Sequence, residues 1–209
     1  MDVVCLRLGW DGPCFHSDGQ LGIVWRSFWT SKPPICSHGF AMTQDSSQEL
    51  KAQLAPILGQ IPSGVFILVA GNKEGQQTGL LASWVQQASF EPPQVTIAVN
   101  KSRYLNDWIT VGSPVTINQL RQKDPALFRH FGRGFEPDVD AFEGVAAESA
   151  ACGLPQLPDS MATLEGRIES KMKAGDHNIY LVTLTGGTAH QAPDEFSPFV
   201  HIRRNGFSY

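Results

Sequence analysis

The sequence predicts a mainly β protein: an antiparallel β-barrel, closed or split, with short flanking helices. From residue 65 onward, short strand-like segments alternate with turns, and residues 161–173 follow a period of two. Few helical segments separate these strands, which favours antiparallel pairing over a doubly wound α/β sheet. The sequence contains no glycine-rich dinucleotide loop, no P-loop and no serine-hydrolase elbow. It therefore gives no support to a Rossmann unit or to the common glycine-loop chemistries.

The composition is that of a globular protein of modest size. The chain has 209 residues, of which 42% are hydrophobic and 17% charged, and a net charge of −4. This suits one sizeable domain, with or without an extension. Because the chain has no Lys/Arg cluster, we expect no nucleic-acid partner. The longest apolar run, residues 65–70, is too short to span a membrane, and the first residues lack the apolar stretch of a secretory signal. We therefore expect a cytoplasmic protein with no membrane partner.

Residues 1–41 differ from the rest of the chain. They hold three of the five Trp and three of the four Cys, and they show no sustained period. From Met42 the pattern becomes regular, because a capping box (Ser46 to Glu49) precedes apolar residues at helical spacing and predicts a helix over 46–58. We expect an N-terminal extension of unclear structure over 1–41 and one domain over 42–209. Met42 is then either the natural first residue or the residue that follows a genuine N-terminal arm.

Later elements follow from apolar runs, alternation and turn residues. The predicted strands are 65–70, 79–85, 95–100, 115–118, 161–173 and 178–185, and the predicted short helices are 103–111 and 124–131. In 161–173, alternation predicts one buried face formed by Leu164, Gly166, Ile168, Ser170 and Met172. The solvent-exposed face is then formed by Glu165, Arg167, Glu169, Lys171 and Lys173. The segment 178–185 is apolar on both faces, as in a strand covered on both sides within a barrel or at a subunit contact. Residues 133–160, rich in Gly, Pro and Ala, predict a long surface loop.

Two segments carry residue types suited to ligand binding. Residues 78–84 (TGLLASW) join a glycine turn to a strand that holds two hydroxyls and an indole. They indicate either an ordinary hairpin or a place where a planar ligand approaches the backbone. Residues 100–103 (NKSR) offer an amide, a hydroxyl and two cations at a strand end before a predicted helix. They indicate either a solvated helix cap or an anion site.

The remaining candidates are weaker alone. His177 follows a Gly-Asp turn and is either an ordinary turn residue or a donor near a bound ring or anion. Residues 131–135 (FGRGF) place two aromatic rings and a cation at the start of the long loop, as a core plug or as a lid over a cofactor. The six His and four Cys show no metal-ligand spacing and no C-x-x-C pair, so we assign no metal and expect reduced thiols.

Taken together and in order, these motifs resemble the flavin reductase-like family with an FMN-binding split barrel. The landmarks TGLLASW, SFEPP, NKSR, TINQL, FGRGF and GDH cover about residues 48–209. More narrowly, ASWVQQASFEPP, the stretch after FGRGF and the ending HIRRNGFSY resemble the C-terminal flavin reductase module of cyanobacterial flavodiiron proteins. We expect this module to stand alone here, because 209 residues leave no room for a diiron domain and a flavodoxin domain, and residues 1–41 match no known pattern.

The resemblance implies a site and a reaction. It implies that FMN is held around its ring by Thr78, Gly79, Leu81, Ala82, Ser83 and Trp84, at its phosphate by Asn100, Lys101 and Ser102, and by Asn118 in support. It further implies that Phe131, Arg133 and His177 border the place where nicotinamide or a flavin substrate stacks. The implied activity is hydride transfer from NAD(P)H to flavin in a homodimer. The flavin carries the chemistry, so no acid–base pair is required.

Two functions follow from this site. The first is an NAD(P)H-dependent flavin oxidoreductase. The alternative is an FMN-binding electron carrier, similar to flavoredoxin, that receives electrons from a redox protein partner and has no productive nicotinamide site. The choice between NADH and NADPH, the final electron acceptor and the tightness of flavin binding all stay open at the level of sequence.

Overall fold

The computed structural model describes residues 44–122, 125–190, 192 and 197–208. Residues 1–41, which the sequence sets apart as an extension, lie outside the described residues, so the boundary at Met42 stays a prediction. Within the described residues, no helix is both long and apolar enough to cross a membrane.

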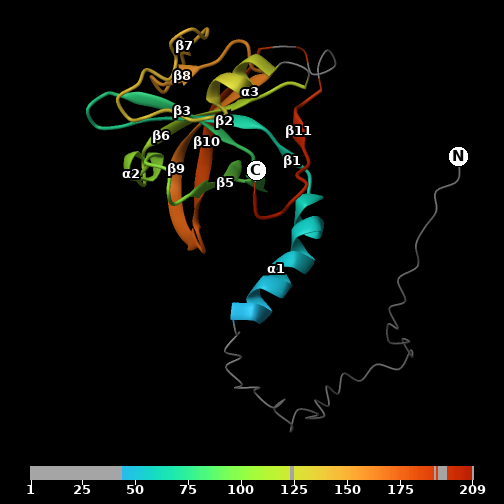
Figure 1. Ribbon diagram of the computed structural model, residues 1–209. Coiled ribbons are helices and arrows are strands. Elements are labelled where there is room, and N and C mark those ends of the chain that lie inside the picture. The colour runs from blue at the N-terminus through green and yellow to red at the C-terminus, as the bar shows by residue number, and fades with distance from the viewer. Residues whose placement is uncertain (1–43, 123–124, 191, 193–196, 209) are drawn as a thin grey trace, which may run out of the picture. The chain divides into compact units, whose positions relative to one another are not determined.

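Strands dominate the described chain, with three helices among its described residues (Figure 1). The helices are α1 (Gln44–Gly59), α2 (Leu105–Trp108) and α3 (Pro125–Phe131). The strands are β1 (Ser63–Gly64), β2 (Phe66–Gly71), β3 (Gln77–Ala82), β4 (Val85–Ser89), β5 (Gln94–Asn100), β6 (Pro114–Gln119), β7 (Glu148–Ser149), β8 (Pro155–Gln156), β9 (Ala162–Ala174), β10 (His177–Ala189) and β11 (Val200–His201).

The main sheet closes on itself through one continuous stretch of chain. Its seven strands lie in the order β3-β2-β6-β9-β10-β5-β4, and every neighbouring pair is antiparallel. The two end strands, β3 and β4, are consecutive in sequence and are separated only by Ser83 and Trp84. The chain therefore leaves one edge of the sheet and immediately joins the other. The predicted split antiparallel barrel is confirmed, and its split lies at Ser83–Trp84.

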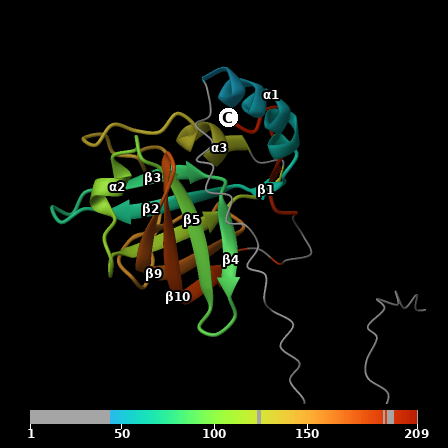
Figure 2. The same ribbon diagram turned by 90° about the horizontal axis from the view of Figure 1, so that it is seen from below.

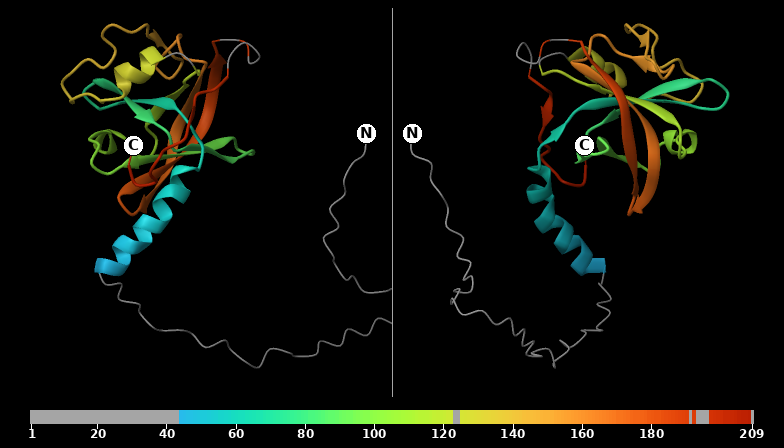
Figure 3. Two further views of the ribbon diagram at one scale, coloured as in Figure 1. Left: turned by 45° about the vertical axis from the view of Figure 1, so that its right-hand side comes forward. Right: turned by 180° about the vertical axis from the view of Figure 1, so that it is seen from behind.

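The core has an inner and an outer layer. Alternate residues of β5, namely Val95, Ile97 and Val99, point into the barrel, as the period of two requires. Strand β2 is buried on both faces: Leu68 belongs to the inner cluster and Ile67 to the outer one. The outer layer forms where α3 and residues 133–160 cover β2, β3 and β6 (Figure 3). This covering positions the loop beside the barrel closure.

Most predicted elements are confirmed within a few residues. The run predicted over 79–85 is instead divided between β3 and β4, because the chain changes sheet edge there. Helix α1 begins at Gln44, so Ser46 lies within its first turn. The helix predicted over 103–111 is limited to Leu105–Trp108. Residues 133–160 carry the β7–β8 hairpin and are packed against the barrel more firmly than a surface loop, since Ala141 and Leu157 are fully buried.

The alternation predicted over 161–173 holds only in part. Gly166 and Ile168 are buried as predicted, but Met172 is 59% exposed. Glu165, predicted to face solvent, is buried, and its carboxylate accepts a hydrogen bond from the backbone N–H of Cys152 at 2.9 Å. The physical reason is the segment around Cys152, which covers this part of β9, whereas the last residues of β9 carry no covering layer among the described residues.

Candidate functional site

A cavity of about 480 Å³ lies beside the barrel closure. Strand β3 and the end of β5 form one wall, and the C-terminal end of α3 with the following turn forms another. Eight of the predicted site residues line this cavity: Leu81, Ala82, Ser83, Asn100, Ser102, Phe131, Arg133 and His177. The structure thus brings together residues that lie up to about a hundred positions apart in the sequence.

Two further cavities adjoin the first and hold three more of the predicted residues. One, of about 420 Å³, includes Thr78 and Gly79 and shares Ser102 and Arg133 with the central cavity. The other, of about 680 Å³, includes Trp84 and shares three predicted residues with the central cavity, which are Ser83, Asn100 and His177. The three cavities share these lining residues and together form a cleft at the barrel closure.

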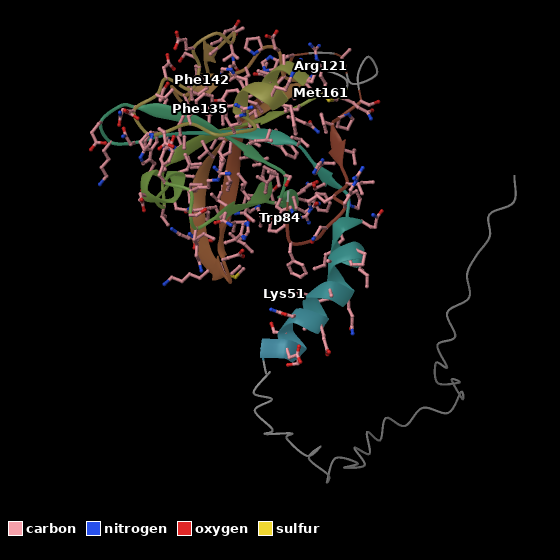
Figure 4. The ribbon with its side chains drawn as sticks, viewed as in Figure 1. Lys51, Trp84, Arg121, Phe135, Phe142 and Met161 are labelled. Carbon is pink, nitrogen blue, oxygen red and sulfur yellow. The ribbon has the colours of Figure 1, made fainter. Side chains whose placement is uncertain are left out.

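Gly79 is glycine because a buried ring occupies the space beside it. A Cβ atom placed on Gly79 would lie 2.4 Å from Cε1 of Phe131, which is too close for any real contact. Phe131 is fully buried and packs edge-on against Phe135, which Figure 4 labels beside α3. Thr78, on the same strand, exchanges a hydrogen bond with the hydroxyl of Tyr104 at 2.8 Å. This part of the wall is therefore fixed by packing.

The turn after β5 supplies the charged end of the cleft. The backbone N–H of Ser102 donates to the side-chain oxygen of Asn100 at 2.9 Å, and that of Arg103 donates to the Asn100 carbonyl at 3.0 Å. These bonds fold the turn so that Ser102 and Arg103 border both the central and the 420 Å³ cavities. Arg129, from α3, also lines the central cavity. An anion held here would face guanidinium groups from two elements.

Lys101 is not among the residues that line the cleft. Its ammonium donates to the backbone carbonyl of Gly175, and its own N–H donates to the carbonyl of Asp176. The structure therefore places Lys101 against the β9–β10 turn, whereas Arg103 lines the central and the 420 Å³ cavities. The NKSR pattern contained both cations, but their directions depend on the fold of the turn.

Asn118 also lies apart from the cleft. It is fully buried, and its side-chain oxygen accepts hydrogen bonds from the N–H of Leu157 at 2.9 Å and from the hydroxyl of Thr163 at 2.7 Å. Its amide donates to the carbonyl of Ile67 at 3.3 Å. Asn118 thus links Leu157, within residues 133–160, to β2 and β9 through hydrogen bonds.

His177 is held by its neighbour at the start of β10. Its Nδ1 lies 2.8 Å from the carboxylate of Asp176, and this hydrogen bond lowers the pKa of Asp176 below its ordinary value. The ladder places His177 directly opposite Asn100 on β5. Its ring centroid lies 4.8 Å from that of Trp84, whose position Figure 4 labels near the C-terminal end of α1. A fixed imidazole therefore joins the central cavity to the 680 Å³ cavity.

The one cysteine among the described residues lies outside the cleft. Cys152 is a free, half-buried thiol, and burial raises its pKa, so it stays protonated at neutral pH. The other three cysteines lie outside the described residues. Among the residues that the structure describes, no group of three or more His, Cys, Asp or Glu could hold a metal ion.

Comparisons with known proteins identify the family of the chain. The family model described as "Flavin reductase like domain" matches residues 58–208. Diflavin flavoprotein A 1 of Synechocystis is 37% identical over 164 residues, which cover 78% of this chain and 28% of that protein. The chain thus spans less than a third of the length of the curated relatives it matches.

Solved structures share the fold. The NADH:FAD oxidoreductase SgcE6 of Streptomyces globisporus superposes with a TM-score of 0.66 at 24% identity, covering 78% of this chain and 93% of that one. The flavin reductase HpaC, solved with NADP⁺, gives a TM-score of 0.59 at 22% identity, covering 76% and 94%. With the family model matching most of the described residues, this chain belongs to the flavin reductase-like domain family.

Proposed function

We propose that this chain is an FMN-binding oxidoreductase that transfers hydride from NAD(P)H to flavin. The observation that carries the proposal is the cleft at the barrel closure, which gathers eleven of the residues predicted for flavin and nicotinamide binding. Family membership and the shared fold support the same reaction class.

The cleft offers what FMN requires at each end. The central cavity, at about 480 Å³, lies within the range of small-molecule sites, and Leu81, Ala82 and Val99 give it an apolar wall with little bulk for a planar ring. At the other end, Ser102 and Arg103 supply a hydroxyl and a guanidinium for a phosphate. We assign the phosphate to these two residues, and we leave Lys101 and Asn118 out of the binding site.

The chain's own residues bind, orient and shield the ligands. Bound FMN would accept hydride from the nicotinamide and pass electrons on, so the protein need not supply a general acid or base. Arg133 borders the central cavity, where its guanidinium would attract a second anionic ligand. His177, fixed by Asp176, keeps a polar ring at the wall of the same cavity. Holding both rings in contact supplies most of what hydride transfer needs from the protein.

One observation favours the alternative function, an FMN-binding electron carrier served by a redox protein partner. Phe131, predicted to border the nicotinamide site, is fully buried against Gly79. Phe131 therefore borders the central cavity but has no exposed ring face on which a nicotinamide could stack. The carrier would use the same FMN contacts and would receive electrons through the open side of the cleft.

We also propose that the protein acts as a homodimer. The outer side of β4, β5, β10 and β9, side by side in Figure 2, presents Ala98, Ile179, Leu181 and Met172, none of which is fully buried. Ala98 and Ile179 also line the 680 Å³ cavity beside Trp84. A second copy seated on this face would complete the cleft. Size-exclusion chromatography with light scattering tests it, and a monomer at micromolar concentration would contradict it.

The deciding experiment is an anaerobic titration of the FMN-loaded protein with NADPH and with NADH, followed by the flavin absorption band. Fast bleaching by either nucleotide supports the oxidoreductase and identifies its donor. A band that persists with both nucleotides but falls with dithionite supports the carrier. A parallel binding titration with FMN and FAD tests the flavin itself, since tighter binding of FAD would overturn the choice of FMN.

A further inference from the structure

The C-terminal segment, residues 200–208, is fastened to the end of α1 at two points. The N–H of Arg203 donates to the carbonyl of Gly59 at 2.9 Å, and the N–H of Gly206 donates to the carbonyl of Ala55 at 2.8 Å. Both contacts require glycine. A Cβ on Gly59 would lie 2.7 Å from the Arg203 carbonyl oxygen, and one on Gly206 would lie 2.3 Å from Cβ of Leu58. The segment therefore has one defined position.

This position turns Arg203 inward. Arg203 is 9% exposed, whereas Ile202 before it is 54% exposed and Arg204 after it is also exposed. Its guanidinium lies 5.2 Å from the ring centroid of Trp84, within the range of a cation–π contact. A hydrogen bond of 3.2 Å to the carbonyl of Gly206 fixes its direction. The buried guanidinium is thus held by a hydrogen bond and an aromatic contact.

Trp84 is the residue through which Arg203 reaches the cleft. It lies at the barrel split, where neither β3 nor β4 includes it, and it packs against His177 with ring centroids 4.8 Å apart. Together with Arg203 and the end of the C-terminal segment, Trp84 encloses the 680 Å³ cavity that adjoins the central one. Its half-buried indole thus contacts both the His177 ring and the Arg203 guanidinium.

We infer that Arg203 is a positioning residue of the flavin site, because it orients the Trp84 indole at the barrel split. The C-terminal segment that carries Arg203 is thereby part of the wall of the cleft. The inference rests on the proposed function for the ligand, but the orientation of Trp84 is a property of the protein alone. The proposed function and the proposed role of Arg203 can therefore be refuted separately.

The test compares three variants of the full chain with the wild type. R203M removes the charge and keeps the length of the side chain, and R203K restores a cation. R204M is the matched control, because Arg204 is the exposed neighbour on the same segment. The readouts are the Trp84 indole N–H signal in NMR spectra, identified with W84F, and the dissociation constant for FMN.

We expect R203M to shift the indole signal and to weaken FMN binding by about 2- to 30-fold, the span of a cation–π contact. R203K should restore part of both, and R204M should match the wild type. An unchanged indole signal in R203M would overturn the inference. If the wild type binds no flavin, the proposed function fails, while the indole signal still decides the role of Arg203.

A second variant guards against a general loss of structure. G206A leaves Arg203 intact but displaces the segment, because its Cβ has no room beside Leu58. It should shift the Trp84 signal in the same way as R203M at a temperature where both variants are folded. A G206A protein that is folded and keeps the wild-type indole signal would show that the segment does not orient Trp84.

Discussion

Replacing Gly79 by alanine is expected to destabilise the protein and to weaken flavin binding together. The new Cβ would lie 2.4 Å from Cε1 of Phe131, 2.8 Å from its Cδ1 and 3.2 Å from Cγ2 of Ile67. Neither neighbour is at the surface, since both are fully buried, so the ring and the strand must move. Overpacking of this kind costs about 1–3 kcal/mol. For a domain of roughly 150–250 residues this corresponds to a fall in Tm of about 2–12 °C.

The assay is thermal unfolding with and without FMN. Gly186→Ala on β10 is the matched control, because a Cβ there meets nothing closer than 3.8 Å and its backbone is not left-handed. Shortening the ring should relieve the clash, so the G79A and F131L changes should be less than additive, with a coupling of about 0.5–3 kcal/mol. A G79A protein that unfolds at the same temperature as G186A would refute the packing argument.

Three further outcomes are expected. Arg103→Gln should weaken FMN binding by roughly 10- to 100-fold, as the loss of a charge-assisted contact predicts. Lys101→Gln should leave the FMN dissociation constant nearly unchanged. If Lys101→Gln weakens FMN binding more than Arg103→Gln does, Lys101 is the residue that binds the phosphate. Asn118→Ala should lower the free energy of unfolding by about 1–3 kcal/mol or more by leaving a buried N–H unpaired, with the FMN dissociation constant retained. Because His177 lowers the pKa of Asp176, the stability from this pair is complete above about pH 3.8 and is lost as the pH falls through the lower folded-state value. A carboxyl NMR titration of wild type and H177Q measures this, and equal midpoints would contradict it.

The strands could be predicted from the sequence because their pattern is local. The alternation of β5 and the apolar run of β2 report burial directly, and both elements lie where predicted. The break at Ser83–Trp84 has no such signal, since the apolar run continues across it and only the closure of the sheet divides it. The sequence also gives no signal for a distant segment that covers a strand. This is why the alternation places Glu165 on a solvent-exposed face, although the residue is buried.

The placement of the site residues also differs between strands, where a local pattern predicts it, and turns, where none does. Residues on β3, such as Leu81 and Ala82, line the central cavity, because the direction of a side chain on a strand follows from its place in the alternation. In the turn after β5, neighbouring cations point in different directions, so the pattern could not tell Lys101 from Arg103. Arg203 was missed because an arginine near a chain end has no local pattern that predicts its burial.

The positions of the cleft residues depend on the pairing of β5 with β10 and with the chain at Trp84, more than on any single side chain. Asn100 and His177 meet because β5 and β10 pair in one register, and Trp84 joins them because its carbonyl accepts a hydrogen bond from the N–H of Ala98 at 3.0 Å. A slip of one residue would turn Asn100 and His177 to opposite faces. The ring-binding wall therefore cannot adjust in small steps. Ser102 and Arg103 lie on a turn, which can adjust. Substitutions at these two residues should therefore alter the affinity for the phosphate and leave the ring-binding wall intact.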